Sequence, residues 1–299
     1  MYLESVEQLI KIAKENGQTL GRMALILEAK DREVPEEHLL NIMRERLQVM
    51  RAAVTEGLQG NRSVGGLVGG QALKYQAWYN SGKSLASGVF GKAITYALAV
   101  SEANASMGLI VAAPTAGSAG VIPGVLLSIM EEYEIPEEKV IEGLYAAGAV
   151  GLVIAFKASL SGAQGGCQAE CGSAAAMAAV AATELLGGSP EQAAHAGAIA
   201  LKGMLGLVCD PVAGLVEVPC VKRNVSAAVQ ALAAVDLALA GITSAIPLDE
   251  VIGAMGEIGR ELPISLKETA QGGLAATPTG KALAQKIFGR KEEKNGENN

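Results

Sequence analysis

The sequence contains a run of 28 residues without a charged side chain, from Ala103 to Met130, long enough to cross a lipid bilayer. Proline and glycine interrupt the run, and Pro-Thr-Ala-Gly-Ser stands at its centre. A bilayer offers no partners to the backbone groups that such breaks expose. The N-terminal residues form a charged amphipathic pattern that does not resemble a signal peptide. We therefore expect no membrane span and a cytoplasmic protein.

Small side chains dominate the composition. The chain has 51 Ala and 37 Gly among 299 residues, and only 3% aromatic residues. Half of the residues are apolar, which excludes a disordered chain. Lys and Arg (24) are fewer than Asp and Glu (31), which argues against a nucleic-acid-binding protein. No alternation of polar and apolar residues is sustained, so we predict an all-α fold in which Gly-rich loops connect closely packed helices.

Charge is unevenly distributed along the chain. Residues 1–56 carry 18 charged side chains, whereas residues 143–220 carry seven, so the first part predicts exposed helices and the second a buried interior. Ser189-Pro190-Glu191-Gln192 predicts a capping box, and Thr279 is expected to cap a last helix that runs to Phe288. We expect one domain over residues 1–289 and a disordered polar tail over 290–299.

Four cysteines fall within the charge-poor region: Cys167, Cys171, Cys209 and Cys220. Four buried thiols that act as small apolar residues are a full alternative to any metal site. The spacing differs from the paired C-x2-C pattern of structural zinc sites, and it is not ferredoxin-like either. From spacing alone, buried thiols, zinc and an iron–sulfur cluster therefore all remain open.

Two polar segments could bind an anion. The loop from Ala112 to Gly120 is rich in small and hydroxyl residues, and it would form an anion site if the apolar run after it is helical. The segment around Lys83 ends like a phosphate-binding loop but lacks the first glycine of that pattern. His38 and His195 belong to no catalytic motif, and we expect both to be surface or packing residues.

Several longer motifs occur together and in order: SGKSLASG (81–88), NASMG (104–108), PTAGSAGVIPG (114–124), SGAQGGCQAECGS (161–173), MLGLVCDPVAGLVEVPCVKRN (204–224) and QGGLAATPTG (271–280). With these motifs the chain resembles the alpha subunit of bacterial iron–sulfur-dependent L-serine dehydratase (L-serine ammonia-lyase). The resemblance extends from the N-terminal helix to about Gly289.

The resemblance implies a mostly helical catalytic domain with a [4Fe–4S] cluster. In that family three cysteines hold the cluster and one iron stays open to substrate, and Cys167, Cys209 and Cys220 match the ligand motifs. Cys171 falls where the family requires no cysteine. The open iron would act as a Lewis acid on the hydroxyl group of L-serine, and the aminoacrylate product would hydrolyse to pyruvate and ammonia.

The remaining roles are hypotheses within this resemblance. We expect the substrate carboxylate at Thr115, Ala116, Gly117 and Ser118, with Asn104 as a further binding residue and Lys83 as a tentative electrostatic partner. The general base is unassigned, and we expect it on a separate beta subunit in a hetero-oligomer. L-threonine or L-cysteine as substrate, or a non-catalytic metal-binding subunit, are the alternatives.

Overall fold

The computed structural model describes residues 3–296, and from residue 290 onward it describes the backbone only. Within this range the chain is helical and contains no strand, as the all-α prediction requires. A single parallel bridge joins Cys209 to Lys267. The α-helices are α1 (Val6–Glu15), α2 (Leu20–Arg32), α3 (Glu36–Gly57), α4 (Gln71–Asn80), α5 (Gly88–Ala105), α6 (Val121–Glu132), α7 (Glu137–Lys157), α8 (Gly162–Gly165), α9 (Ser173–Leu185), α10 (Pro190–Lys202), α11 (Cys220–Leu239), α12 (Leu248–Glu261) and α13 (Pro278–Gly296).

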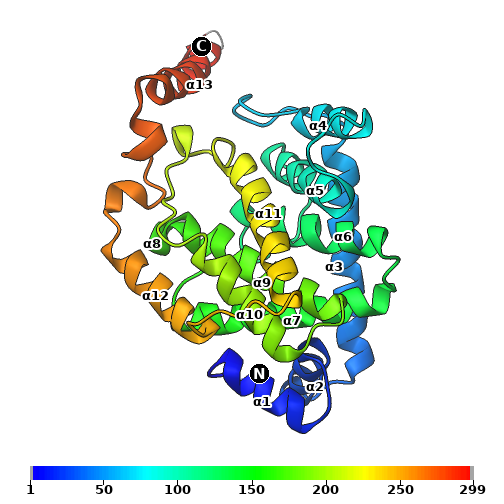
Figure 1. Cartoon of the computed structure of the whole chain (residues 1–299). Helices are drawn as coiled ribbons and strands as arrows, with labels where there is room; N and C mark the ends of the chain where they lie inside the picture. Colours follow the sequence, from blue (N-terminus) through cyan, green and yellow to red (C-terminus); the bar gives the residue numbers. More distant parts are fainter. Residues whose placement is uncertain (1–2, 297–299) are drawn as a thin grey trace.

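The Ala-rich helix α9 lies at the centre, where α6, α7, α10 and α11 pack around it (Figure 1). Every residue from Ser173 to Thr183 is buried. Small residues allow helices to approach closely: at Gly57 of α3 an added Cβ would stand 1.9 Å from the carbonyl oxygen of Ala99 in α5. Alanine and glycine therefore replace large aromatic side chains as the means of filling this core.

The uncharged run that opens the sequence analysis forms the end of α5, a loop and helix α6. Helix α6 is buried from Val121 to Ile129, so its apolar residues belong to the protein core. Among the described residues one helix, α7, is long and apolar enough to cross a membrane. Because 67% of its apolar window is buried inside the protein, α7 is mainly a core helix.

The predicted helix ends are partly correct. The capping box at Ser189 is present, with Gln192 as its reciprocal partner. The prediction that Thr279 caps the last helix is wrong, because α13 begins at Pro278 and the Thr277 hydroxyl accepts the Gly280 N–H at 3.1 Å. The expected polar tail stays a prediction, since side chains from residue 290 onward and residues 297–299 lie outside the described part.

Candidate functional site

Three chain segments bring the four cysteines into one buried region. Cys167 lies just before the π-helical turn η2 (Gln168–Gly172), and Cys171 lies within it. Cys209 lies in the segment after α10, and Cys220 begins α11. All four side chains are buried and none forms a disulfide. The segment between Cys209 and Cys220 includes the short helix η3 (Val212–Gly214). The charge-poor region of the sequence is thus the protein interior, as predicted.

A tightly packed glycine and the buried Gln168 side chain hold the first cysteine segment in place. Gly166 has a φ of +77°, and an added Cβ there would stand 2.8 Å from the carbonyl oxygen of Leu207. The buried Gln168 side chain donates to the carbonyl oxygens of Gly165 and Met255 and accepts the Gly206 N–H. These contacts fix the turn that carries Cys167 against the chain that leads to Cys209.

The cysteine thiols lie close enough to influence one another electrostatically. Burial first, and then the negative charge of Cys167, raise the pKa of Cys220 to about 12. The same two causes, burial first, raise the pKa of Cys209 well above its usual range. A hydrogen bond with Cys171 lowers the pKa of Cys167, and the nearby Arg223 guanidinium acts in the same direction. Among the four cysteines, Cys167 is therefore the one whose thiolate form these surroundings stabilise.

An ion pair joins two of the cysteine segments. Arg223 donates to the carbonyl oxygen of Val208 at 2.8 Å and pairs with Asp210 at 2.8 Å. Asp210 also accepts the Leu274 N–H at 2.7 Å, so it holds the short helix η5 (Gly273–Ala276) over this region. The positive charge of Arg223 acts to lower the pKa of both Cys167 and Cys220.

The Thr115–Ser118 loop faces the same region. It includes the short helix η1 (Ala116–Ser118) and leads directly into α6, so the run after it is helical, as the anion-site hypothesis requires. Asn224 of α11 ties this loop to the cysteine-bearing helix: its Nδ2 donates to the Gly117 carbonyl oxygen at 2.7 Å, and its Oδ1 accepts the Gly120 N–H at 2.9 Å. Asn104 donates to the Ala116 carbonyl oxygen at 3.0 Å, which places it beside the loop.

Glu170 connects the loop to the cysteines. Its Oε1 accepts the Thr115 hydroxyl at 2.7 Å, and its Oε2 lies 4.0 Å from the Cys209 sulfur. Burial raises the pKa of Glu170, while the Thr115 hydrogen bond acts against that rise. Glycine is needed here, because a Cβ at Gly162 would stand 2.7 Å from Glu170 and 3.0 Å from the Cys209 sulfur.

The structure does not bring every candidate residue into this cluster. Lys83 is exposed in the turn after α4, and within the described part it makes no hydrogen bond or ion pair. His195 accepts the Ser244 N–H at 3.2 Å through Nδ1, as expected of a packing residue, and His38 lies on α3. The sequence analysis missed the roles of Glu170, Arg223 and Asn224, although each stands within a motif that it singled out.

The arrangement of donors bears on what this site can hold. Among residues 3–289, no three His, Cys, Asp or Glu side chains lie close enough to bind one metal ion. An iron–sulfur cluster is several atoms wide, so its cysteine ligands stand farther apart than the ligands of a single ion. Buried thiols from three segments are the donor type that iron–sulfur clusters use, so the donor set at this site fits such a cluster.

Comparisons with known proteins show similarity to serine dehydratase alpha chains. The family model described as serine dehydratase alpha chain matches residues 5–275. The probable L-serine dehydratase, alpha chain, of Bacillus subtilis is 54% identical over 285 residues, which are 95% of each chain. The L-serine dehydratase, alpha chain, of Peptoniphilus asaccharolyticus is 43% identical over 94% of this chain and 97% of its own.

One relative is much longer than this chain. The L-serine dehydratase of Streptomyces coelicolor is 42% identical over 279 residues, which are 90% of this chain but only 60% of the Streptomyces protein. Two-fifths of that protein therefore lies outside the region of similarity.

Proposed function

The chain belongs to the serine dehydratase alpha chain family, and on this premise we propose that it is the cluster-binding subunit of a two-chain, cytoplasmic L-serine dehydratase. The enzyme is a lyase that releases pyruvate and ammonia from L-serine. The observation that carries the proposal is the convergence of three cysteine segments with the Thr115–Ser118 loop in one buried region.

Cys167, Cys209 and Cys220 are the proposed ligands of a [4Fe–4S] cluster. Thiolates are the usual ligands of iron–sulfur clusters, and these three come from the three segments that meet at the site. Cys171 is fully buried one helical turn from Cys167, and we assign it to packing. When bound, a cluster with three protein ligands leaves one iron open to polarise the substrate hydroxyl group.

The chain's own residues bind and orient the substrate. The Thr115–Ser118 loop would receive the carboxylate through backbone N–H groups and hydroxyls, as loops at helix N-termini commonly do. Asn224 holds this loop from the α11 side, and Asn104 holds it through its amide nitrogen and keeps its carbonyl oxygen for the substrate ammonium group. Glu170 orients the Thr115 hydroxyl.

The site is sheltered from bulk water, which strengthens each of these polar contacts. The cysteine side chains are buried, and Asp210 holds η5 against the segment that carries Cys209. Lys83 has no described contact with the loop, so a role for it would require movement of the turn that follows α4.

The general base and part of the active site are assigned to a beta chain. Neither histidine of this chain lies at the site, and in the Streptomyces relative two-fifths of the polypeptide lies outside the matched region. In a hetero-oligomer, a separate beta chain would supply what the unmatched part of the Streptomyces protein supplies within one polypeptide.

The test is reconstitution under anaerobic conditions. The alpha chain is purified without oxygen, mixed with a beta chain of the same family, and assayed for pyruvate from L-serine, L-threonine and L-cysteine. We expect turnover of L-serine and loss of both colour and activity in air. Faster turnover of L-threonine or L-cysteine would favour the alternative substrates, and a colourless protein would favour a non-catalytic subunit.

A further inference from the structure

Helix α7 exposes an apolar stripe that the described part of the chain leaves uncovered. Gly148, Leu152 and Ala155 are exposed at positions that recur on one face of the helix. Leu152 is 40% exposed. Most other residues of α7 between Val140 and Ile154 are buried, chiefly against α2 and α9.

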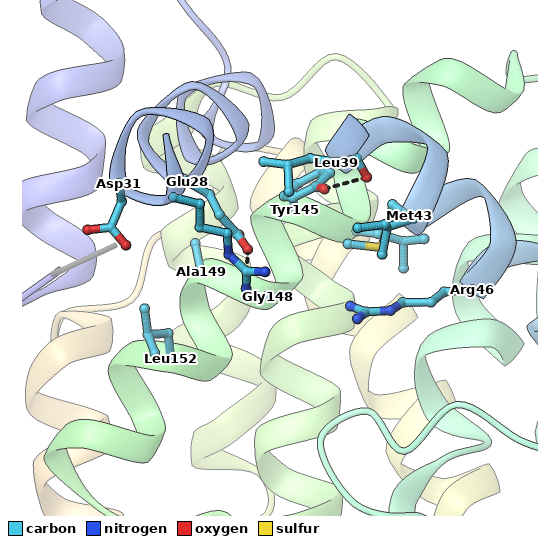
Figure 2. A pocket seen from close by; sticks show the side chains of 12 residues that line it. Glu28, Asp31, Leu39, Met43, Arg46, Tyr145, Gly148, Ala149 and Leu152 are labelled. Carbon is cyan, nitrogen blue, oxygen red and sulfur yellow. Dashed lines mark hydrogen bonds and ion pairs between the residues drawn. The ribbon is translucent and has the colours of Figure 1, made fainter. Parts of the chain in front are cut away.

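This stripe forms one wall of a groove. Two adjoining cavities of about 340 Å³ each lie between α7 and α3, and they share Met43, Arg46, Leu144, Gly148 and Leu152. Figure 2 shows the first cavity, with Arg46 extending from α3 toward α7. The second cavity continues the groove to Val111 and Pro114.

Arg46 is the charged residue that lines both cavities of the groove, and Glu28, Asp31 and Arg32 line the first cavity only. Within the described part of the chain its guanidinium makes no hydrogen bond and no ion pair, and no dashed line reaches it in Figure 2. Other arginines nearby are paired: Arg32 with Glu28 and Arg51 with Glu137. A partner that covers the groove would need a carboxylate to satisfy Arg46.

At its far end the groove adjoins a segment whose backbone N–H and carbonyl groups lack backbone hydrogen bonds. Among residues 3–289, no backbone hydrogen bond is made to or from residues 109–113. The segment is not helical, and the side chains of Met107 and Leu109 at its start are 81% and 72% exposed. A chain that docks here would supply hydrogen-bond partners to these backbone groups and cover the exposed apolar side chains.

The groove also leads to the proposed active site. Residues 111–114 form its end wall, and Thr115 of the substrate loop is the next residue along the chain. A chain seated in the groove and along residues 109–113 would therefore end beside the Thr115–Ser118 loop, where the general base assigned to the beta chain is needed.

From these observations we propose that the groove between α3 and α7, together with residues 107–113, is the docking surface for the beta chain. This proposal rests on the proposed two-chain enzyme, and it assigns the contact surface between the alpha and beta chains to the groove. The occupant is an apolar segment that carries a carboxylate for Arg46. A flat bilayer fits this surface poorly, because the groove is concave and Glu28, Asp31, Arg32 and Arg46 line it.

The test measures the dissociation constant of the full-length alpha and beta chains by anaerobic isothermal titration calorimetry. Leu152→Arg places a charge in the groove, and Arg46→Glu reverses the charge that should meet the partner. Leu237→Arg is the matched control, because Leu237 is also 40% exposed but lies on α11. Circular dichroism and iron content verify that each variant is folded and loaded.

We expect Leu152→Arg and Arg46→Glu to weaken association at least tenfold, and Leu237→Arg to change it less than twofold. Unchanged association of both groove variants would refute the groove while leaving the two-chain enzyme intact. The groove would also not be the beta-chain docking surface if its variants abolished only self-association of the alpha chain. The same conclusion would follow if they abolished only its binding to phosphatidylcholine–phosphatidylglycerol vesicles. If the wild-type chains do not associate, both the groove and the two-chain enzyme are wrong.

Discussion

Asn224 is the residue whose replacement tests the link between the substrate loop and the cysteine-bearing helix. Its side chain is 1% exposed and bonds the Gly117 carbonyl oxygen and the Gly120 N–H. Asn224→Ala leaves both groups without these partners. A buried unsatisfied donor costs about 1–3 kcal/mol, and a half-buried carbonyl costs about 1 kcal/mol, so the free energy of unfolding should fall by about 2–4 kcal/mol.

Urea unfolding of the cluster-free alpha chain measures this loss. In the reconstituted enzyme the same variant should raise the KM for L-serine, because the loop is no longer held, while iron content stays unchanged. Ser226→Ala is the control, since Ser226 is exposed on the same helix and should change stability by less than about 0.5 kcal/mol. If Asn224→Ala behaves like Ser226→Ala in both measurements, Asn224 does not support the loop.

Three further predictions follow from the buried groups. Cys171→Ala should retain the cluster, whereas alanine at any of the three proposed ligands should lose it, as iron analysis and the visible spectrum would report; loss with Cys171→Ala would refute the ligand assignment. Arg223→Gln leaves Asp210, whose side chain is 4% exposed, without its ion-pair partner and should destabilise the chain by about 3 kcal/mol in urea; a loss below about 1 kcal/mol would show that the pair matters little. Burial raises the pKa of Glu184 above its ordinary value of 4.5, so the folded chain binds this proton more tightly than the unfolded chain. Stability contributed by Glu184 should therefore fall as pH rises from about 4.5 through the raised pKa, and Glu184→Gln should flatten that slope in thermal unfolding; an unchanged slope would contradict this cause.

Much of the fold follows from patterns that local physics determines. The capping box at Ser189 and the buried charge-poor region depend on residue type and short-range spacing, and both are confirmed. The cap of α13 was displaced by two residues, because threonine stands at both Thr277 and Thr279 and the sequence does not show which one begins the helix.

The site was harder to derive, because it is assembled from distant segments. Spacing alone left buried thiols, zinc and an iron–sulfur cluster open, and a family resemblance was needed to propose three ligands among four cysteines. Glu170 and Asn224 act across 55 and 107 residues of sequence, from Glu170 to Thr115 and from Asn224 to Gly117. No periodicity reports such a contact, so only the folded chain reveals which polar residues hold the substrate loop.

The groove between α3 and α7 shows a related limit of sequence patterns. Helix α7 is apolar on nearly all faces, which predicts a buried helix, yet Leu152 is 40% exposed. The sequence pattern does not distinguish an apolar face that meets its own core from one that awaits another chain.

The central claim is that this chain holds a cluster whose open iron meets L-serine. Electron paramagnetic resonance of the anaerobically prepared, reduced alpha–beta enzyme, with and without L-serine, tests it most directly. The account predicts about four irons per alpha chain and a cluster signal that L-serine changes. A preparation that contains zinc or no metal, or a cluster signal that saturating L-serine leaves unchanged, would contradict it.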